Sequence, residues 1–198
     1  DSLGTFKLLF VLNGDDSDET ANRFKGTGDE KFEYNTETTK DSASEKIFRA
    51  SLTTSITANQ SIEYGGEVAI NTVGGEFTNL ERDLAVDLLA TTNSDVVDIK
   101  ENRYEIFAHH TYNISPKLVL QSSLTTEFSK IVANNSSAGV ALAPRNTSFT
   151  YLKPRVNLRY DVTNTDQFRV TVEKKVSQLD FENFVTSFDR STEILRLG

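Results

Sequence analysis

The stretch that decides the fold is residues 60–73, which read Gln-Ser-Ile-Glu-Tyr-Gly-Gly-Glu-Val-Ala-Ile-Asn-Thr-Val. Its even positions carry Ile62, Tyr64, Val68 and Ile70, whereas most of its odd positions carry polar or small residues. Successive side chains of a β-strand point to opposite faces of the sheet, so this alternation predicts a strand with one apolar face and one polar face.

The same period of two recurs along the chain, in residues 5–12, 48–56, 104–112, 118–128, 156–162 and 168–176. Phe107 is an exception, because it interrupts the polar face of its segment. Short turn-rich junctions at 57–59, 115–117 and 164–166 alternate with long polar stretches at 13–44, 74–95 and 134–147. We therefore expect about seven strands, several of them longer than the ~5–6 residues usual in soluble sheets.

The composition excludes several classes of protein. The chain has 198 residues, a net charge of −8, 37% hydrophobic residues and no cysteine. These values exclude a collagen, a coiled coil and a disulfide scaffold, and the acidic balance argues against a nucleic-acid partner. The sequence contains no nucleophile elbow, phosphate loop or zinc motif, so we expect neither an enzyme nor a cofactor or metal.

Two all-β architectures fit the alternation. A soluble secreted sandwich or adhesin-like module buries the apolar face between two sheets, whereas a transmembrane barrel turns that face to lipid. Short turns at one end and long loops at the other are typical of an outer-membrane barrel. Aromatic residues also lie on the apolar face close to the short turns, where a periplasmic girdle is expected: Tyr64, Tyr112, Tyr160 and Phe168.

The strand count adds an expectation about domain organisation. Bacterial single-chain barrels have an even number of strands and must close, because an open edge leaves backbone groups unpaired in lipid. An odd count therefore indicates that residues 1–198 are part of one barrel domain, a fragment of a larger antiparallel transmembrane barrel with short periplasmic turns and long extracellular loops.

Residues 149–160, Phe-Thr-Tyr-Leu-Lys-Pro-Arg-Val-Asn-Leu-Arg-Tyr, and residues 175–181, Lys-Val-Ser-Gln-Leu-Asp-Phe, resemble strands of TonB-dependent outer-membrane receptors. Residues 45–52 and 61–67 resemble the same barrels. The resemblance implies a 22-stranded barrel in the outer membrane of a Gram-negative bacterium, which imports a scarce nutrient with energy from TonB. It implies as partners the lipid bilayer with lipopolysaccharide, the remaining barrel strands, a plug that reaches TonB and is not present here, and an unidentified small-molecule or peptide ligand.

A set of charged residues shares the polar, lumen-facing side of two neighbouring strands and makes up the candidates for lining the lumen or contacting the plug: Arg155, Arg159, Arg169, Glu173 and Lys175. Cross-strand pairing in a hydrated wall is the alternative role for these residues.

Five further features carry weaker expectations. His109 and His110 are neighbours on one strand, so they should face opposite ways and cannot share a metal ion. The acidic run 15–19 suits either a cation site or a solvated loop. A four-residue leucine repeat in residues 80–88 suits either a capped helix or an irregular loop. Pro154 predicts a bulge or a rim position, and the Gly65-Gly66 pair predicts either close packing or a bend in its strand.

Overall fold

The computed structural model describes residues 4–27, 29–84, 88–176, 187–189 and 194–196. Every regular element in these residues is a β-strand. The strands are β1 (Thr5–Thr27), β2 (Glu30–Thr57), β3 (Gln60–Asp83), β4 (Leu88–Ser115), β5 (Leu118–Ser137), β6 (Val140–Ala141), β7 (Arg145–Asp161), β8 (Gln167–Glu173), β9 (Ser187–Asp189) and β10 (Ile194–Arg196). Within the described residues, no helix is long and apolar enough to cross a bilayer.

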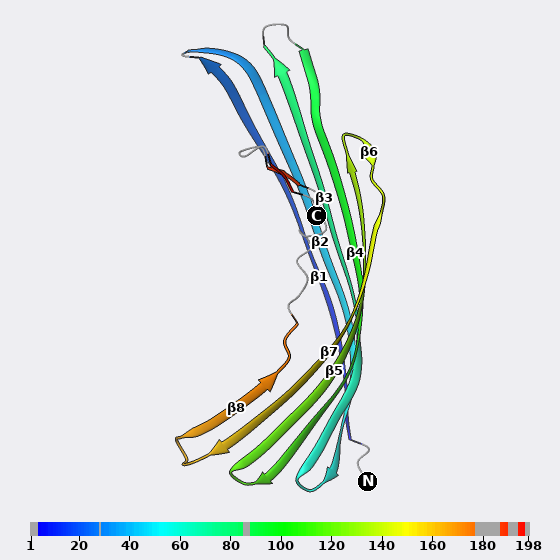
Figure 1. Ribbon diagram of the computed structural model, residues 1–198, viewed down its shortest axis with the longest axis vertical. Coiled ribbons are helices and arrows are strands. Elements are labelled where there is room, and N and C mark those ends of the chain that lie inside the picture. Colours follow the sequence, from blue (N-terminus) through cyan, green and yellow to red (C-terminus); the bar gives the residue numbers. More distant parts are fainter. Residues whose placement is uncertain (1–3, 28, 85–87, 177–186, 190–193, 197–198) are drawn as a thin grey trace.

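The main sheet is an antiparallel meander in the order β1-β2-β3-β4-β5-β7-β8, with β6 added beside β5 (Figure 1). Strands that follow one another along the path are also spatial neighbours, and the long strands twist along their length so that β8 swings away from β1. A separate hairpin pairs β9 with β10. The predicted all-β, antiparallel class is therefore confirmed, whereas the main sheet is not closed into a cylinder.

The short junctions are turns, as predicted. Residues 58–59 join β2 to β3, residues 116–117 join β4 to β5, and residues 162–166 join β7 to β8. The last turn is held by its own side chains, because the Thr163 hydroxyl donates to the Asp166 carboxylate at 2.6 Å and accepts from the Asp166 backbone N–H at 2.9 Å. These three turns lie at one end of the sheet, which we call the short-turn end.

Where the structure describes them, the long polar stretches 13–44 and 74–95 are almost entirely strand rather than loop, and this corrects the sequence-based expectation. The stretch 134–147 is only partly strand, because residues 138–139 and 142–144 connect β5, β6 and β7. The β1–β2 ladder continues to the pair Thr27–Glu30, and the β3–β4 ladder continues to Asp83–Leu88. Polar side chains bridge these extensions, as Tyr34 does by donating to Asn22 at 2.6 Å. In the leucine repeat, Leu80 lies on β3, Leu84 lies in the turn that follows it and Leu88 begins β4, so the described residues of the repeat form no helix; residues 85–87 lie outside the described residues. Cross-strand polar bonds thus support strands whose hydrophobic pattern has ended.

The even-numbered side chains form one continuous apolar face. The register places five of them on one rung that crosses five strands: Phe10, Phe48, Val68, Tyr104 and Phe128. Their exposed fractions lie between 38% and 65%. On the far side of this rung the same face becomes more polar, because the next rung carries Lys46, Asn102 and Lys130 beside Leu12 and Ile70. The apolar band therefore ends at this rung on β2, β4 and β5.

The buried residues lie on the opposite face, which we call the polar face. Ile99, Ile131 and Ala133 form a small cluster there, against which Val73, Val97 and Phe149 pack. The described residues form one main layer, so the two stacked sheets that a sandwich requires are not present among them. The large side chains of the apolar face remain exposed in this layer.

Pro154 is accommodated without the predicted bulge. It pairs with Leu124 in a β5–β7 ladder that has no register shift. The β7–β8 ladder ends at the neighbouring pair Arg155–Glu173, so Pro154 lies just beyond the last rung of that pairing. A residue without a backbone N–H is tolerated at such a position because no ladder donor is lost on that side.

Candidate functional site: the charged polar face

Three carboxylates lie directly opposite one another on the polar face. Glu67 of β3 pairs in register with Glu105 of β4, which pairs with Glu127 of β5. Like charges in directly opposed positions destabilise a sheet unless cations stand between them. This acidic rung therefore depends on its neighbours.

Two groups of cations neutralise the acidic rung. Arg49 and Arg103 lie 3.5 Å and 3.4 Å from the carboxylate of Glu67. Lys153 of β7 lies between the other two carboxylates, with its Nζ 2.9 Å from Glu105 and 2.7 Å from Glu127. The side chains of both glutamates are only 15% and 14% exposed, so water screens these contacts less than it screens ordinary surface pairs.

A fourth carboxylate, Glu101, is held by neutral donors. Asn71 donates its side-chain amide to Glu101 at 2.8 Å, and the hydroxyl of Ser129 donates to the other oxygen at 2.6 Å. All three residues are buried. Hydrogen bonds to a charged acceptor are the stronger kind, and they allow a carboxylate to be retained here without an ion pair.

Phe107, which interrupts the polar pattern in the sequence, covers Gly65. The two residues are opposite each other in the β3–β4 register, and a Cβ built on Gly65 would lie 2.9 Å from the Phe107 ring. The guanidinium of Arg49 lies 4.1 Å from the ring centroid, and His109 stacks at 5.0 Å. Phe107 is only 3% exposed, because Gly65 has no side chain and leaves space for the Phe107 ring to be buried on the polar face. The predicted close packing at the glycine pair is confirmed at Gly65.

Four of the five predicted wall residues lie on β7 and β8, and Lys175 lies two residues beyond the end of β8. Arg155 faces Glu173 across the ladder, and Arg159 faces Arg169. Glu173 forms ion pairs with two cations, Arg155 at 3.5 Å and Lys175 at 3.2 Å. Arg159 turns instead to Asp161 at 3.6 Å, and Arg169 donates to Gln167 at 3.1 Å. Each of the two opposed arginines thus contacts an acceptor on its own strand, which offsets the repulsion between their charges.

The sequence analysis did not single out Lys153, Arg103, Glu105 or Glu127, although Lys153 forms the shortest ion pairs of the polar face, with Glu105 and Glu127. Their odd positions placed them on this face. Their association follows from the register between strands, which no single strand encodes.

The two histidines lie on opposite faces, as predicted. His109 stacks on Phe107 of the polar face and lies 4.0 Å from Glu63, whereas His110 contacts Gln60 at 3.1 Å and lies beside Tyr112. Within the part of the chain that the structure describes, no group of three or more His, Asp or Glu residues could hold a metal ion.

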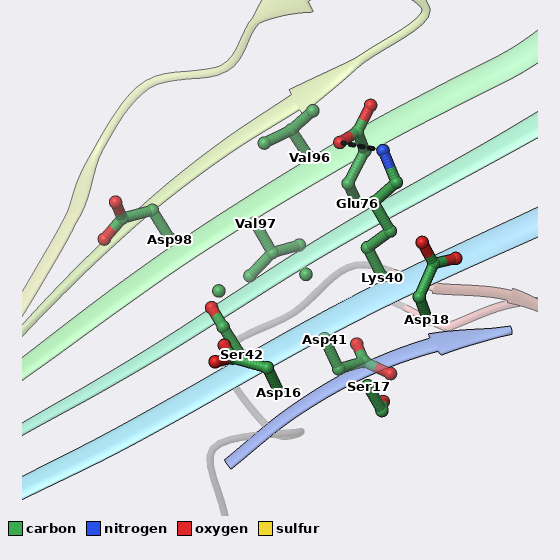
Figure 2. Close-up of a pocket in the computed structure, with 12 residues that line it drawn as sticks. Asp16, Ser17, Asp18, Lys40, Asp41, Ser42, Glu76, Val96, Val97 and Asp98 are labelled. Carbon is green, nitrogen blue, oxygen red and sulfur yellow. Dashed lines mark ion pairs between the residues drawn. The ribbon is translucent and has the colours of Figure 1, made fainter. Parts of the chain in front are cut away.

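The acidic run of β1 lines a pocket of about 520 Å³ at the strand extensions, shown in Figure 2. Asp16 and Asp18 approach it from β1, and Asp98 approaches it from β4. Gly74 and Gly75 also line it, and Lys40 lies 3.9 Å from Glu76. No metal-binding group is found among these residues, so the cation-site interpretation gains no support.

The four predicted girdle residues lie at the short-turn end on the even, apolar face. Tyr160 pairs with Phe168, and Tyr112 pairs with Leu120 on the next strand. Tyr64, Tyr160 and Phe168 are 46%, 43% and 58% exposed. This end of the sheet therefore presents aromatic rings outward on four different strands.

The chain matches no protein-family model, no curated protein and no solved structure. The arrangement itself offers a large exposed apolar surface on one face and a wall of fixed charges and hydroxyl groups on the other.

Proposed function

We propose that this chain forms part of the wall of an outer-membrane β-barrel, with its apolar face in lipid and its polar face lining a hydrated lumen. The observation that carries the proposal is the continuous apolar face, whose large side chains remain exposed across all seven strands of the sheet path. Contiguous apolar patches beyond a few hundred Å² are rare on soluble monomers, and they mark protein or membrane contacts.

The height of the apolar band fits a bilayer. Tyr104 and Tyr112 mark its two edges on β4. At ~3.3 Å per residue and ~40° of tilt, the eight residues between them cover roughly 20 Å, close to the ~25 Å apolar band of outer-membrane barrels. The rung of lysine and asparagine residues beyond Tyr104 lies where headgroups and water would begin. The paired strand extensions would then project into solvent.

The polar face suits a lumen. Paired carboxylates and cations are costly in lipid, but they are stable where water and neighbouring charges satisfy them. The resemblance of residues 149–160 and 175–181 to TonB-dependent receptors supports the more specific proposal of TonB-energised uptake of a scarce nutrient. Residues 177–181 of that motif lie outside the described residues.

The chain contains no native tryptophan, so a single introduced tryptophan reports its own surroundings. Phe128→Trp places the probe on the apolar face, and Tyr151→Trp provides a matched aromatic control on the polar face. Refolding into vesicles whose acyl chains carry bromine should quench the fluorescence of Phe128→Trp strongly and that of Tyr151→Trp weakly. Equal quenching of the two, or a monomeric fold in buffer without detergent, would refute the membrane orientation.

TonB-dependent uptake needs a separate test in the bacterium that makes the protein. Deleting the gene should abolish energy-dependent uptake of one scarce nutrient, and restoring the gene should recover it. Uptake that persists when TonB is absent would refute the receptor assignment and leave the barrel-wall proposal to the fluorescence experiment.

A further inference from the structure

A second pocket lies on the polar face, where β8 ends and the chain leaves the sheet. Its volume is about 420 Å³, within the ~300–1,000 Å³ range of small-molecule sites. Two rungs of the ladder build its wall. His109, Ser123, Arg155 and Glu173 share one rung, and Thr125 and Lys153 share the next.

The charge at this pocket is predominantly positive. Lys153 is already held by the carboxylates of Glu105 and Glu127. Three further cations, Arg155, Lys174 and Lys175, line the pocket with a single carboxylate, Glu173. Glu173 is shared between Arg155 and Lys175 at distances above 3 Å, whereas each carboxylate that holds Lys153 lies closer to it. Because the single carboxylate of Glu173 serves both Arg155 and Lys175, some N–H donors of these two side chains can still bind another acceptor.

Two hydroxyl groups add neutral donors to the same wall. Ser123 and Thr125 project from β5 on the polar face between His109 and the β7 cations. Neither hydroxyl has a hydrogen-bond partner among the residues that the structure describes. Hydroxyls beside an arginine and an ammonium group form the combination that binds phosphate or carboxylate oxygens.

We infer that this pocket binds a small oxyanion, a phosphate or carboxylate group, through Arg155, Lys175 and the hydroxyls of Ser123 and Thr125. Glu173 pairs with both cations in the structure, so its carboxylate would compete with the anion. The inference deepens the proposed function, since it assigns an anionic ligand class to the lumen wall. It rests on that function only for the location of the pocket in a lumen.

The test is titration of the full chain, refolded in detergent micelles, with inorganic phosphate at constant ionic strength by isothermal calorimetry. A second titration with acetate separates a phosphoryl ligand from a carboxylate ligand, and saturable binding in either supports the inference. Arg155→Gln should weaken binding by about tenfold or more, because it removes a charged hydrogen-bond donor. Glu173→Gln should strengthen binding several-fold, because it removes the competitor.

Lys7→Gln is the matched control, since it removes one cation from the polar face of the distant strand β1. It should leave affinity unchanged. Thr125→Val keeps the side-chain shape while deleting a hydroxyl, and should weaken binding even if Arg155→Gln fails to fold. The inference is overturned by an absence of saturable binding, by equal losses in Lys7→Gln and Arg155→Gln, or by weaker binding in Glu173→Gln. Vesicle quenching tests the membrane orientation separately.

Discussion

Replacing Gly65 with alanine tests the close packing of Phe107 against the β2–β3 ladder. The new methyl group would overlap the backbone oxygen of Ala50 and would lie 2.9 Å from both the Phe107 ring and the Ser51 Cα. Two of these neighbours are backbone atoms, so a side-chain rotation cannot relieve the clash. Overpacking of this kind typically costs about 1–3 kcal/mol, and the backbone contacts place Gly65→Ala at the upper end of that range.

Gly66→Ala is the matched control, because the two glycines are adjacent and point to opposite faces. A Cβ on Gly66 would lie 3.3 Å from the backbone oxygen of Glu105, which is a tight contact. Replacing glycine with alanine also lowers the backbone entropy lost on folding, which stabilises a strand by about 0.5–1 kcal/mol. This variant should therefore remain within about 0.5 kcal/mol of the wild type.

The assay is urea-induced unfolding in detergent or lipid, followed by the shift in gel mobility between folded and unfolded protein. The expected difference of about 2–3 kcal/mol between the variants corresponds to roughly 30- to 150-fold in the unfolding equilibrium. Equal stabilities for the two glycine variants would show that Phe107 does not press on Gly65. Recovery of full stability on combining Gly65→Ala with Phe107→Leu would show that the backbone contact is unimportant.

Three further outcomes are expected. Lys153→Met should destabilise the fold by about 2 kcal/mol, because Glu105 and Glu127 then face each other without a cation; the loss is smaller than for a fully buried ion pair. The same urea assay measures this loss, and Lys153→Arg should recover part of it. Ile106→Arg on the apolar face should cost about 2–4 kcal/mol in bilayers, whereas Thr53→Arg on the polar face, opposite Glu63, should cost little; equal costs would contradict the assigned faces. Amide hydrogen exchange should be slower along β3 than along β1, since β3 is paired on both sides and β1 on one; uniform protection would contradict the free edge.

Hydrophobic periodicity predicted the strands well where one face was apolar. The segments around Tyr64, Tyr104 and Tyr160 form strands with the expected faces, and the three short turns lie where turn-forming residues cluster. The opposite directions of His109 and His110 followed from the same period of two.

The prediction failed where both faces were polar. The extensions of β1 and β2 carry no apolar alternation, so they read as loops, yet contacts such as Ser44 with Thr72 at 2.6 Å and Tyr34 with Asn22 at 2.6 Å pair them as strands. Such pairs join residues that are distant in sequence, and only the register reveals them. The same limit hid the Lys153 contacts, because Glu105 and Glu127 reach Lys153 from two other strands.

The meander has a geometric consequence for assembly. Its path contains seven strands of alternating direction, so the two outermost strands, β1 and β8, ascend together from the same end. A closed barrel in which every neighbouring pair of strands is antiparallel has an even number of strands. These seven strands can therefore complete such a barrel only with an odd number of additional strands. If identical copies of the sheet were joined edge to edge in the same orientation, β8 of one copy would lie parallel to β1 of the next. Copies of this seven-strand sheet that are related only by rotation therefore cannot form an all-antiparallel barrel.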